Sequence, residues 1–183
     1  MKKIFFLLLS VLFIQGAQAQ FGVRAGYSSG NFEQTNYRNK SGFHIGAYYR
    51  ADADFFSVEP GIQFSQKGYE TNNGQTGAKI DESLSYVDVP LLFRLNFLPR
   101  LNVFAGPQGS VLISRKYSDG TDTVTSTDII RGYDIAGVVG LGVNLPLGIN
   151  AQVSYDFGLT SLNYFDTDVK SRVFKLSVGY DFY

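Results

Sequence analysis

Residues 149–160 read INAQVSYDFGLT, and apolar side chains alternate with polar or small ones along them without a break. Ile149, Val153 and Phe157 fall on one face, whereas Gln152 and Asp156 fall on the other. Side chains alternate between two faces in a strand, whereas a helix repeats every 3.6 residues or so. This stretch therefore predicts a β-strand with one apolar and one polar face.

The same period of two recurs along the rest of the chain. It is found at about residues 21–28, 43–50, 56–65, 86–97, 101–113, 134–145 and 174–182, which makes eight segments with the first. Short turns at 51–54, 98–100 and 146–148 alternate with long polar stretches at 29–41, 70–83, 115–130 and 161–171. Sequential antiparallel strands with such connections form an up-and-down barrel. We therefore expect an all-β fold, an eight-stranded antiparallel up-and-down β-barrel.

The polar face indicates whether such a barrel is soluble or transmembrane. In an outer-membrane barrel the apolar face meets lipid and the polar face encloses the lumen, where charges need partners. Many glycines fall on the polar face, and small residues suit the narrow interior of eight strands. Five basic and five acidic residues fall there too: Arg24, Arg50, Lys67, Arg94, Lys175, Glu59, Asp88, Asp134, Asp156 and Asp181. The pattern favours a transmembrane barrel in the cell outer membrane over a secreted lipocalin-like barrel or sandwich.

These ten residues are predicted to form a structural charge network that fills the lumen. Glu59 with Arg24, Lys67 and Arg94 is alternatively interpreted as a proton or ion relay. We favour the structural interpretation, because enclosed charges need partners in any barrel.

The composition narrows the function further. The chain has 183 residues with 16 Lys and Arg against 16 Asp and Glu, one His and no Cys. Balanced charge gives no general attraction to nucleic acid, and a chain without Cys has neither disulfides nor thiolate chemistry. The single histidine, His44, excludes a His-rich metal site. We therefore expect no nucleic-acid partner, no metal and no cofactor.

The first residues have the pattern of a secretory signal peptide. Lys2 and Lys3 precede an apolar run at 4–14, and small residues with an A-x-A motif follow at 16–19. The run is about half as long as a transmembrane helix requires. We expect residues 1–19 to be removed by cleavage between Ala19 and Gln20, and residues 20–183 to form the barrel domain.

The last strand pattern ends in aromatic residues. Tyr180, Phe182 and Tyr183 close the chain, and Tyr180 and Phe182 lie on the apolar face. A terminal aromatic strand of this kind resembles the signal by which barrel-assembly machinery recognises its clients. We therefore expect these three residues to form a C-terminal assembly signal and the assembly machinery to be a partner.

Three prolines interrupt the strand patterns. Pro60, Pro90 and Pro107 have no N–H to donate, and a closed barrel has no free edge where that loss is harmless. We expect a β-bulge at each of them.

Two segments resemble a known family. Residues 59–68 read EPGIQFSQKG and residues 86–94 read YVDVPLLFR. In order and spacing they resemble the PorT-like outer-membrane β-barrel family of Bacteroidetes-type bacteria, and the later strands resemble that family too. The resemblance implies an integral outer-membrane barrel, in a family whose namesake is associated with type IX secretion.

The expected function is that of a monomeric barrel without an open pore, because eight strands leave little space inside. We expect a structural, adhesive or surface-recognition role, with outer-membrane lipid as surroundings and long connections outside the cell. An accessory subunit of a secretion or envelope complex, with a protein partner, is the main alternative. A lipid-modifying enzyme built around His44 is a weaker one, and we expect no enzymatic activity.

Overall fold

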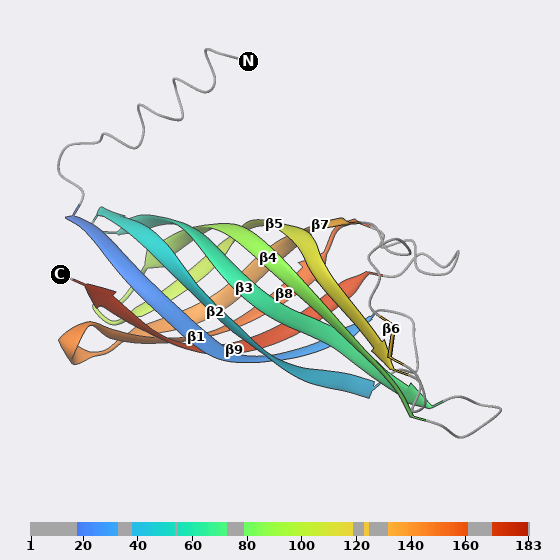
Figure 1. The fold of residues 1–183 in the computed structure, drawn as a ribbon. Coiled ribbons are helices and arrows are strands. Elements are labelled where there is room, and N and C mark those ends of the chain that lie inside the picture. The colour runs from blue at the N-terminus through green and yellow to red at the C-terminus, as the bar shows by residue number, and fades with distance from the viewer. Residues whose placement is uncertain are drawn as a thin grey trace, which may run out of the picture.

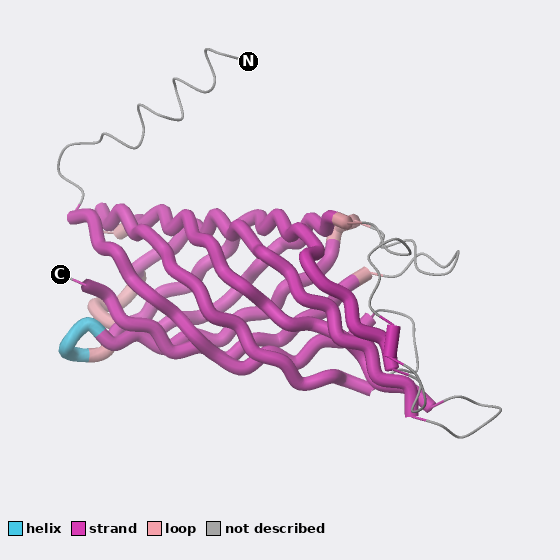
Figure 2. The backbone as a smooth tube through the Cα atoms, in the orientation of Figure 1, coloured by secondary structure: helices cyan, strands magenta, loops and turns pink. Residues whose placement is uncertain are grey.

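The computed structural model describes residues 18–32, 38–53, 55–72, 79–118, 123–124, 132–160 and 170–182. Almost all of them are strands, and a single 3-10 turn, η1, lies at Pro146–Gly148 (Figure 2). The strands are β1 Gln18–Phe32, β2 Arg38–Ala53, β3 Phe56–Asn72, β4 Lys79–Asn96, β5 Leu101–Ser118, β6 Thr123–Val124, β7 Tyr133–Asn144, β8 Ile149–Gly158 and β9 Ser171–Phe182. No helix among the described residues is long and apolar enough to cross a membrane.

The strands form one closed antiparallel sheet (Figure 1). Each long strand pairs with the next one along the chain, and β1 pairs with β9 to close the barrel. The two-residue β6 pairs only with the far end of β5 and takes no part in the closure. The prediction of an eight-stranded up-and-down barrel is therefore confirmed, with β6 as a small addition at its rim.

The two faces of the wall are those that the alternation predicts. Along β9, side chains are alternately buried and exposed from Ser171 to Phe182 without exception. Large apolar side chains such as Ile62, Leu176 and Val178 are more than half exposed, whereas Glu59, Asp88 and Arg94 are at most 2% exposed. This distribution is the reverse of that in a soluble protein, where ionised side chains are almost never fully buried unless paired.

Three of the four predicted long connections are shorter than expected. β1 continues to Phe32, β3 to Asn72 and β5 to Ser118, and β2 and β4 begin well before the predicted strands. The hydrophobic period misses these extensions because they carry polar residues on both faces. As a result β3 and β4 extend furthest at the end of the barrel opposite the short turns (Figure 1).

The expectation of a bulge at each proline is wrong. The pairing of Pro60 with Leu91, of Pro90 with Gln108 and of Pro107 with Gly137 keeps the same offset on both sides of each proline. Near Pro60 and Pro90 the ladder loses rungs but gains no extra residue, since a missing N–H removes a hydrogen bond without lengthening the strand. The two register shifts lie elsewhere, between Asn39 and His44 and between Ser85 and Tyr86.

Inward-facing glycines make room for large lumenal side chains. A Cβ at Gly140 would overlap the ring of Phe104 and the carbonyl oxygen of Val153. We expect Gly140→Ala to lower the free energy of unfolding by about 1–3 kcal/mol, as overpacking does, because the Val153 backbone cannot move aside.

Urea unfolding of the barrel refolded in phospholipid vesicles measures this effect. Gly109→Ala is the matched control, because a Cβ at Gly109 has nothing within 4 Å, and its effect should stay within about 0.5 kcal/mol. Equal losses in the two variants would show that the lumen is not closely packed at Gly140.

Candidate functional site

The structure places all ten residues of the predicted charge network in the lumen. Each is buried, and each lies at an inward position of its strand. They come from β1, β2, β3, β4, β7, β8 and β9, so nearly the whole circumference contributes. Nine of them form two ionic clusters, one toward the short turns and one toward the long connections, and Asp134 lies outside both.

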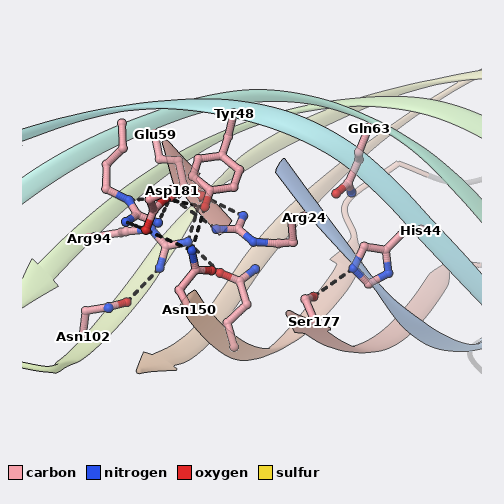
Figure 3. Close-up of polar contacts among 12 residues, drawn as sticks. Arg24, His44, Tyr48, Glu59, Gln63, Arg94, Asn102, Asn150, Ser177 and Asp181 are labelled. Atoms are coloured by element: carbon pink, nitrogen blue, oxygen red, sulfur yellow. Dashed lines mark hydrogen bonds and ion pairs between the residues drawn. The ribbon is translucent and has the colours of Figure 1, made fainter. Parts of the chain in front are cut away.

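Glu59 is the centre of the cluster near the short turns (Figure 3). Its Oε1 accepts hydrogen bonds at 2.8 Å from both Arg24 Nη1 and Arg94 Nη2. Its Oε2 accepts one from Arg50 Nε at 2.8 Å and lies 2.8 Å from Arg50 Nη2 as well. One carboxylate thus holds three guanidinium groups from three different strands.

Asp181 on β9 completes this cluster. It accepts hydrogen bonds from Tyr48 Oη at 2.5 Å, from Asn150 Nδ2 at 3.0 Å and from Arg50 Nη1 at 3.2 Å. The ring of Tyr48 has Arg24 at 4.1 Å and Arg50 at 5.2 Å from its centroid, within the range of a cation–π contact. We call Arg24, Arg50, Glu59, Arg94 and Asp181 the arginine cluster.

Both terminal nitrogens of Arg94 are hydrogen-bonded. Its Nη1 donates to Asn102 Oδ1 at 2.8 Å, and its Nη2 donates to Gln152 Oε1 at 2.6 Å. Its guanidinium lies 4.4 Å from the ring centroid of Phe104, which packs with Leu92 and Val138 in a small apolar core inside the lumen. The guanidinium of Arg94 is therefore held by side chains from several strands.

The second cluster, the lysine cluster, consists of Lys67, Asp88, Asp156 and Lys175. Lys175 Nζ lies 2.6 Å from Asp156 Oδ2 and 3.6 Å from Asp88 Oδ2, and Lys67 Nζ lies 3.5 Å from Asp88 Oδ1. Ser65 Oγ donates to Asp88 Oδ2 at 2.7 Å. The two lysines and two aspartates of the lysine cluster balance in charge, as enclosed ionised groups require.

Two features of the network differ from the sequence interpretation. Lys67 belongs to the lysine cluster and not to the group around Glu59, so the hypothetical relay of Glu59, Arg24, Lys67 and Arg94 is not assembled. Asp134 belongs to neither cluster. It lies at the end of the long connections and accepts hydrogen bonds from Ser171 and Thr160, both at 2.8 Å.

Sequence reasoning missed several buried lumenal side chains. Arg115 is 3% exposed but was assigned to a connection, because β5 extends further than its hydrophobic period. Tyr48, Asn102, Asn150 and Gln152 lie on the polar face that the alternation assigns to the lumen, but the predicted network did not include them. Their role as partners of the arginines depends on the stagger of the strands, which the sequence pattern does not specify.

His44 forms a serine–histidine pair without a catalytic environment. Its Nε2 lies 2.8 Å from Ser177 Oγ, the spacing of a nucleophile and its base. Among the described residues, however, no group is hydrogen-bonded to His44 Nδ1, so the orienting carboxylate of a triad is missing there. Both side chains are at most 2% exposed, and the cavity beside them has a volume of about 20 Å³. A substrate has no access to this pair.

The part of the chain that the structure describes offers no metal site, since no three His, Asp or Glu side chains are grouped suitably in it. Two small cavities lie among the described lumenal residues. The cavity at His44 has about 20 Å³, and one beside Arg24, Tyr48 and Glu59 has about 10 Å³. A cavity needs roughly 10–15 Å³ to hold one water molecule, so each of these two cavities has room for about one water and neither is a channel.

The two terminal predictions lie at the edge of the structure. β1 begins at Gln18, so Ala19 and Gln20 on either side of the predicted cleavage point lie within its first residues. Tyr180 and Phe182 lie on the outer wall with their rings 5.1 Å apart, edge to face, and Tyr183 lies outside the described residues. Cleavage and the assembly signal stay predictions.

Comparison with solved structures supports the fold. The attachment invasion locus protein Ail of Yersinia pestis, solved with the heparin analogue sucrose octasulfate, has a TM-score of 0.56 at 18% identity, over 90% of this chain and 99% of Ail. Neisserial surface protein A has a TM-score of 0.59 at 10% identity, over 92% and 100% of the two chains. OprG of Pseudomonas aeruginosa has a TM-score of 0.55 at 11% identity, over 91% and 97%.

Comparison by sequence identifies the family. No curated protein matches the chain. The family model described as "Outer membrane protein beta-barrel domain" matches residues 13–164, which is most of this chain. The barrel that these residues form, apolar outside and ionic inside, is the arrangement that spans an outer membrane. The chain is therefore an outer-membrane protein, and it belongs to the outer membrane protein beta-barrel domain family.

Proposed function

We propose that this protein is a closed, non-conducting barrel that acts through its outer wall and its extracellular connections, in a structural, adhesive or surface-recognition role. The observation that carries the proposal is the filled lumen. The arginine cluster and the lysine cluster occupy it, and the two cavities found beside their described residues have about 10 and 20 Å³. Transport through such a lumen would require both clusters to break.

The segments 59–68 and 86–94 support a PorT-like type within the family. Recognition would fall to the long connections at the end opposite the short turns, whose central residues 33–37, 73–78, 119–122, 125–131 and 161–169 lie outside the described residues. Ail, a barrel of the same fold, is named as an attachment and invasion protein, so surface attachment is a role that this fold can carry.

We expect no steady single-channel conductance from the purified protein in a planar lipid bilayer. A porin added to the same bilayer is the positive control. Regular conductance steps from this protein alone would contradict a closed lumen. This experiment also separates the proposed role from that of a transport subunit, which would conduct at least intermittently.

The proposed role excludes catalysis at His44. We expect His44→Ala to leave the lipid composition of the envelope unchanged, because the His44–Ser177 pair is buried and no described residue is hydrogen-bonded to His44 Nδ1. Mass-spectrometric lipid profiles of cells with either form measure this. An altered profile at equal protein abundance would support a lipid-modifying enzyme.

A further inference from the structure

An apolar groove of about 740 Å³ opens on the outer wall over β3, β4, β5 and β7, toward the short turns. All of the residues that line it are apolar, among them Phe56, Phe93, Ala105, Val139 and Leu141. Its volume lies in the range of ligand sites, about 300–1,000 Å³. The wall is thus not uniformly convex at this place.

The register explains the hollow. Ala105 on β5 lies directly between Phe93 on β4 and Val139 on β7, so a methyl group is flanked by two larger side chains. Phe56 stacks on Phe93 with ring centroids 6.1 Å apart and planes at 20°, which fixes one side of the groove. The floor at Ala105 is therefore lower than both of its rims.

The surroundings and the lining determine what the groove can bind. It lies on the lipid-facing wall, and its apolar side chains offer neither a hydrogen-bond donor nor an acceptor. A protein segment placed there would need partners for its backbone polar groups, which an apolar groove in the bilayer does not supply. A hydrocarbon chain needs none, so an acyl chain fits this groove better than a peptide.

A cation lies at the end of the same strand. Arg100 is exposed in the turn before β5, and the groove residues Val103 and Ala105 follow it on β5. At about 3.3 Å per residue, Arg100 lies roughly 10 Å from Val103 along the chain. The headgroup region borders the hydrocarbon core, so a basic side chain at this rim can reach a lipid phosphate.

The turn holds Arg100 firmly and leaves its charge available. Leu98 and Leu101 exchange backbone hydrogen bonds of 3.4 and 3.2 Å, and Asn144 N donates to the carbonyl oxygen of Arg100 at 2.7 Å. Arg100 is the single charged residue in the two adjacent turns at 97–100 and 145–148. Among the described residues no carboxylate forms an ion pair with its guanidinium.

We propose that this face of the wall is a fixed phospholipid site, in which an acyl chain occupies the groove and Arg100 donates hydrogen bonds to the headgroup phosphate. An anionic headgroup is preferred, since no carboxylate among the described residues forms an ion pair with Arg100. The site is independent of the closed lumen, so a conducting barrel would leave it untouched.

Quenching by brominated lipid tests the site, because the chain has no Trp and single-tryptophan reporters are therefore clean. Leu101→Trp places a reporter between Arg100 and the groove. Phe21→Trp places one on β1, four strands around the barrel and also near the short turns. In vesicles of brominated phosphatidylglycerol mixed with phosphatidylcholine, we expect about fivefold preference for phosphatidylglycerol at the first reporter and none at the second.

Two further substitutions are made in the L101W background. Ala105→Phe fills the groove and Arg100→Gln removes the charge, and each should abolish the preference. Ala25→Phe, the same change at an exposed alanine on β1, should leave it intact. Heat-modifiable migration on a gel verifies that each variant is folded. If A105F does not fold, the result for R100Q decides whether the lipid site exists.

Three results would overturn the proposal. Equal preference at L101W and F21W would indicate ordinary surrounding lipid only. A preference that survives Ala105→Phe or Arg100→Gln would place the lipid elsewhere. Weaker quenching at L101W than at F21W by every brominated lipid would show that a protein covers the groove.

Discussion

Glu59→Gln is expected to lower the free energy of unfolding by about 3–5 kcal/mol, the cost of removing one partner from a buried ion pair. Glu59 is 1% exposed and its two carboxylate oxygens contact Arg24, Arg50 and Arg94 at 2.8 Å. Without its charge, Asp181 is the single carboxylate left in the arginine cluster. The amide of a glutamine would also point a donor at guanidinium donors.

Urea unfolding in phospholipid vesicles measures this loss, with Asp52→Asn as the control. Asp52 is a half-buried acid on β2 near the same short turns, so its change should cost no more than about 0.5 kcal/mol. Adding Arg94→Gln to Glu59→Gln should restore part of the stability, because it removes one unpaired cation. If Glu59→Gln cost no more than Asp52→Asn, the arginine cluster would have to be hydrated and not closely packed.

The sequence predicts the barrel well because one physical property repeats along it. Each strand within the membrane has one face in lipid and one in the lumen, so its side chains alternate, as Val153 and Ser154 do. The same rule fails beyond the apolar band, where both faces of a strand are polar. The pattern therefore places Arg115 in a connection, although it is buried on β5.

The partners within the lumen are harder to predict. Alternation shows that a side chain points inward, but the stagger of tilted strands determines which side chains share a level. The alternative relay through Glu59 and Lys67 could have been excluded from the sequence, because the two residues lie on the same strand, roughly 26 Å apart at about 3.3 Å per residue. The pairing of Glu59 with Arg24 from β1 and Arg94 from β4 required the register.

Val178→Arg is the second large effect that we expect, a loss of about 2–4 kcal/mol in the free energy of unfolding in a bilayer. Val178 is 58% exposed on the outer wall, between Phe174 and Phe182 of the same strand, and Ala25 and Ala151 flank it. A guanidinium there would have to leave water for the hydrocarbon core. In a soluble protein the same change at an exposed residue would cost almost nothing.

The control lies outside the apolar band. Asn39 is exposed near the start of β2, toward the long connections, and Asn39→Arg should cost no more than about 1 kcal/mol, because charges near the interface remain hydrated. A difference between the two arginine variants therefore reports depth in the bilayer and not the size of the side chain.

The apolar face of this barrel meets lipid while its charges fill the lumen. The unfolding free energy of Val178→Arg relative to Asn39→Arg, measured by urea in phospholipid vesicles, tests that claim most directly. We expect Val178→Arg to be the less stable variant by about 1–4 kcal/mol. Equal stability of the two variants, or a gain from Val178→Arg, would mean that this wall faces water.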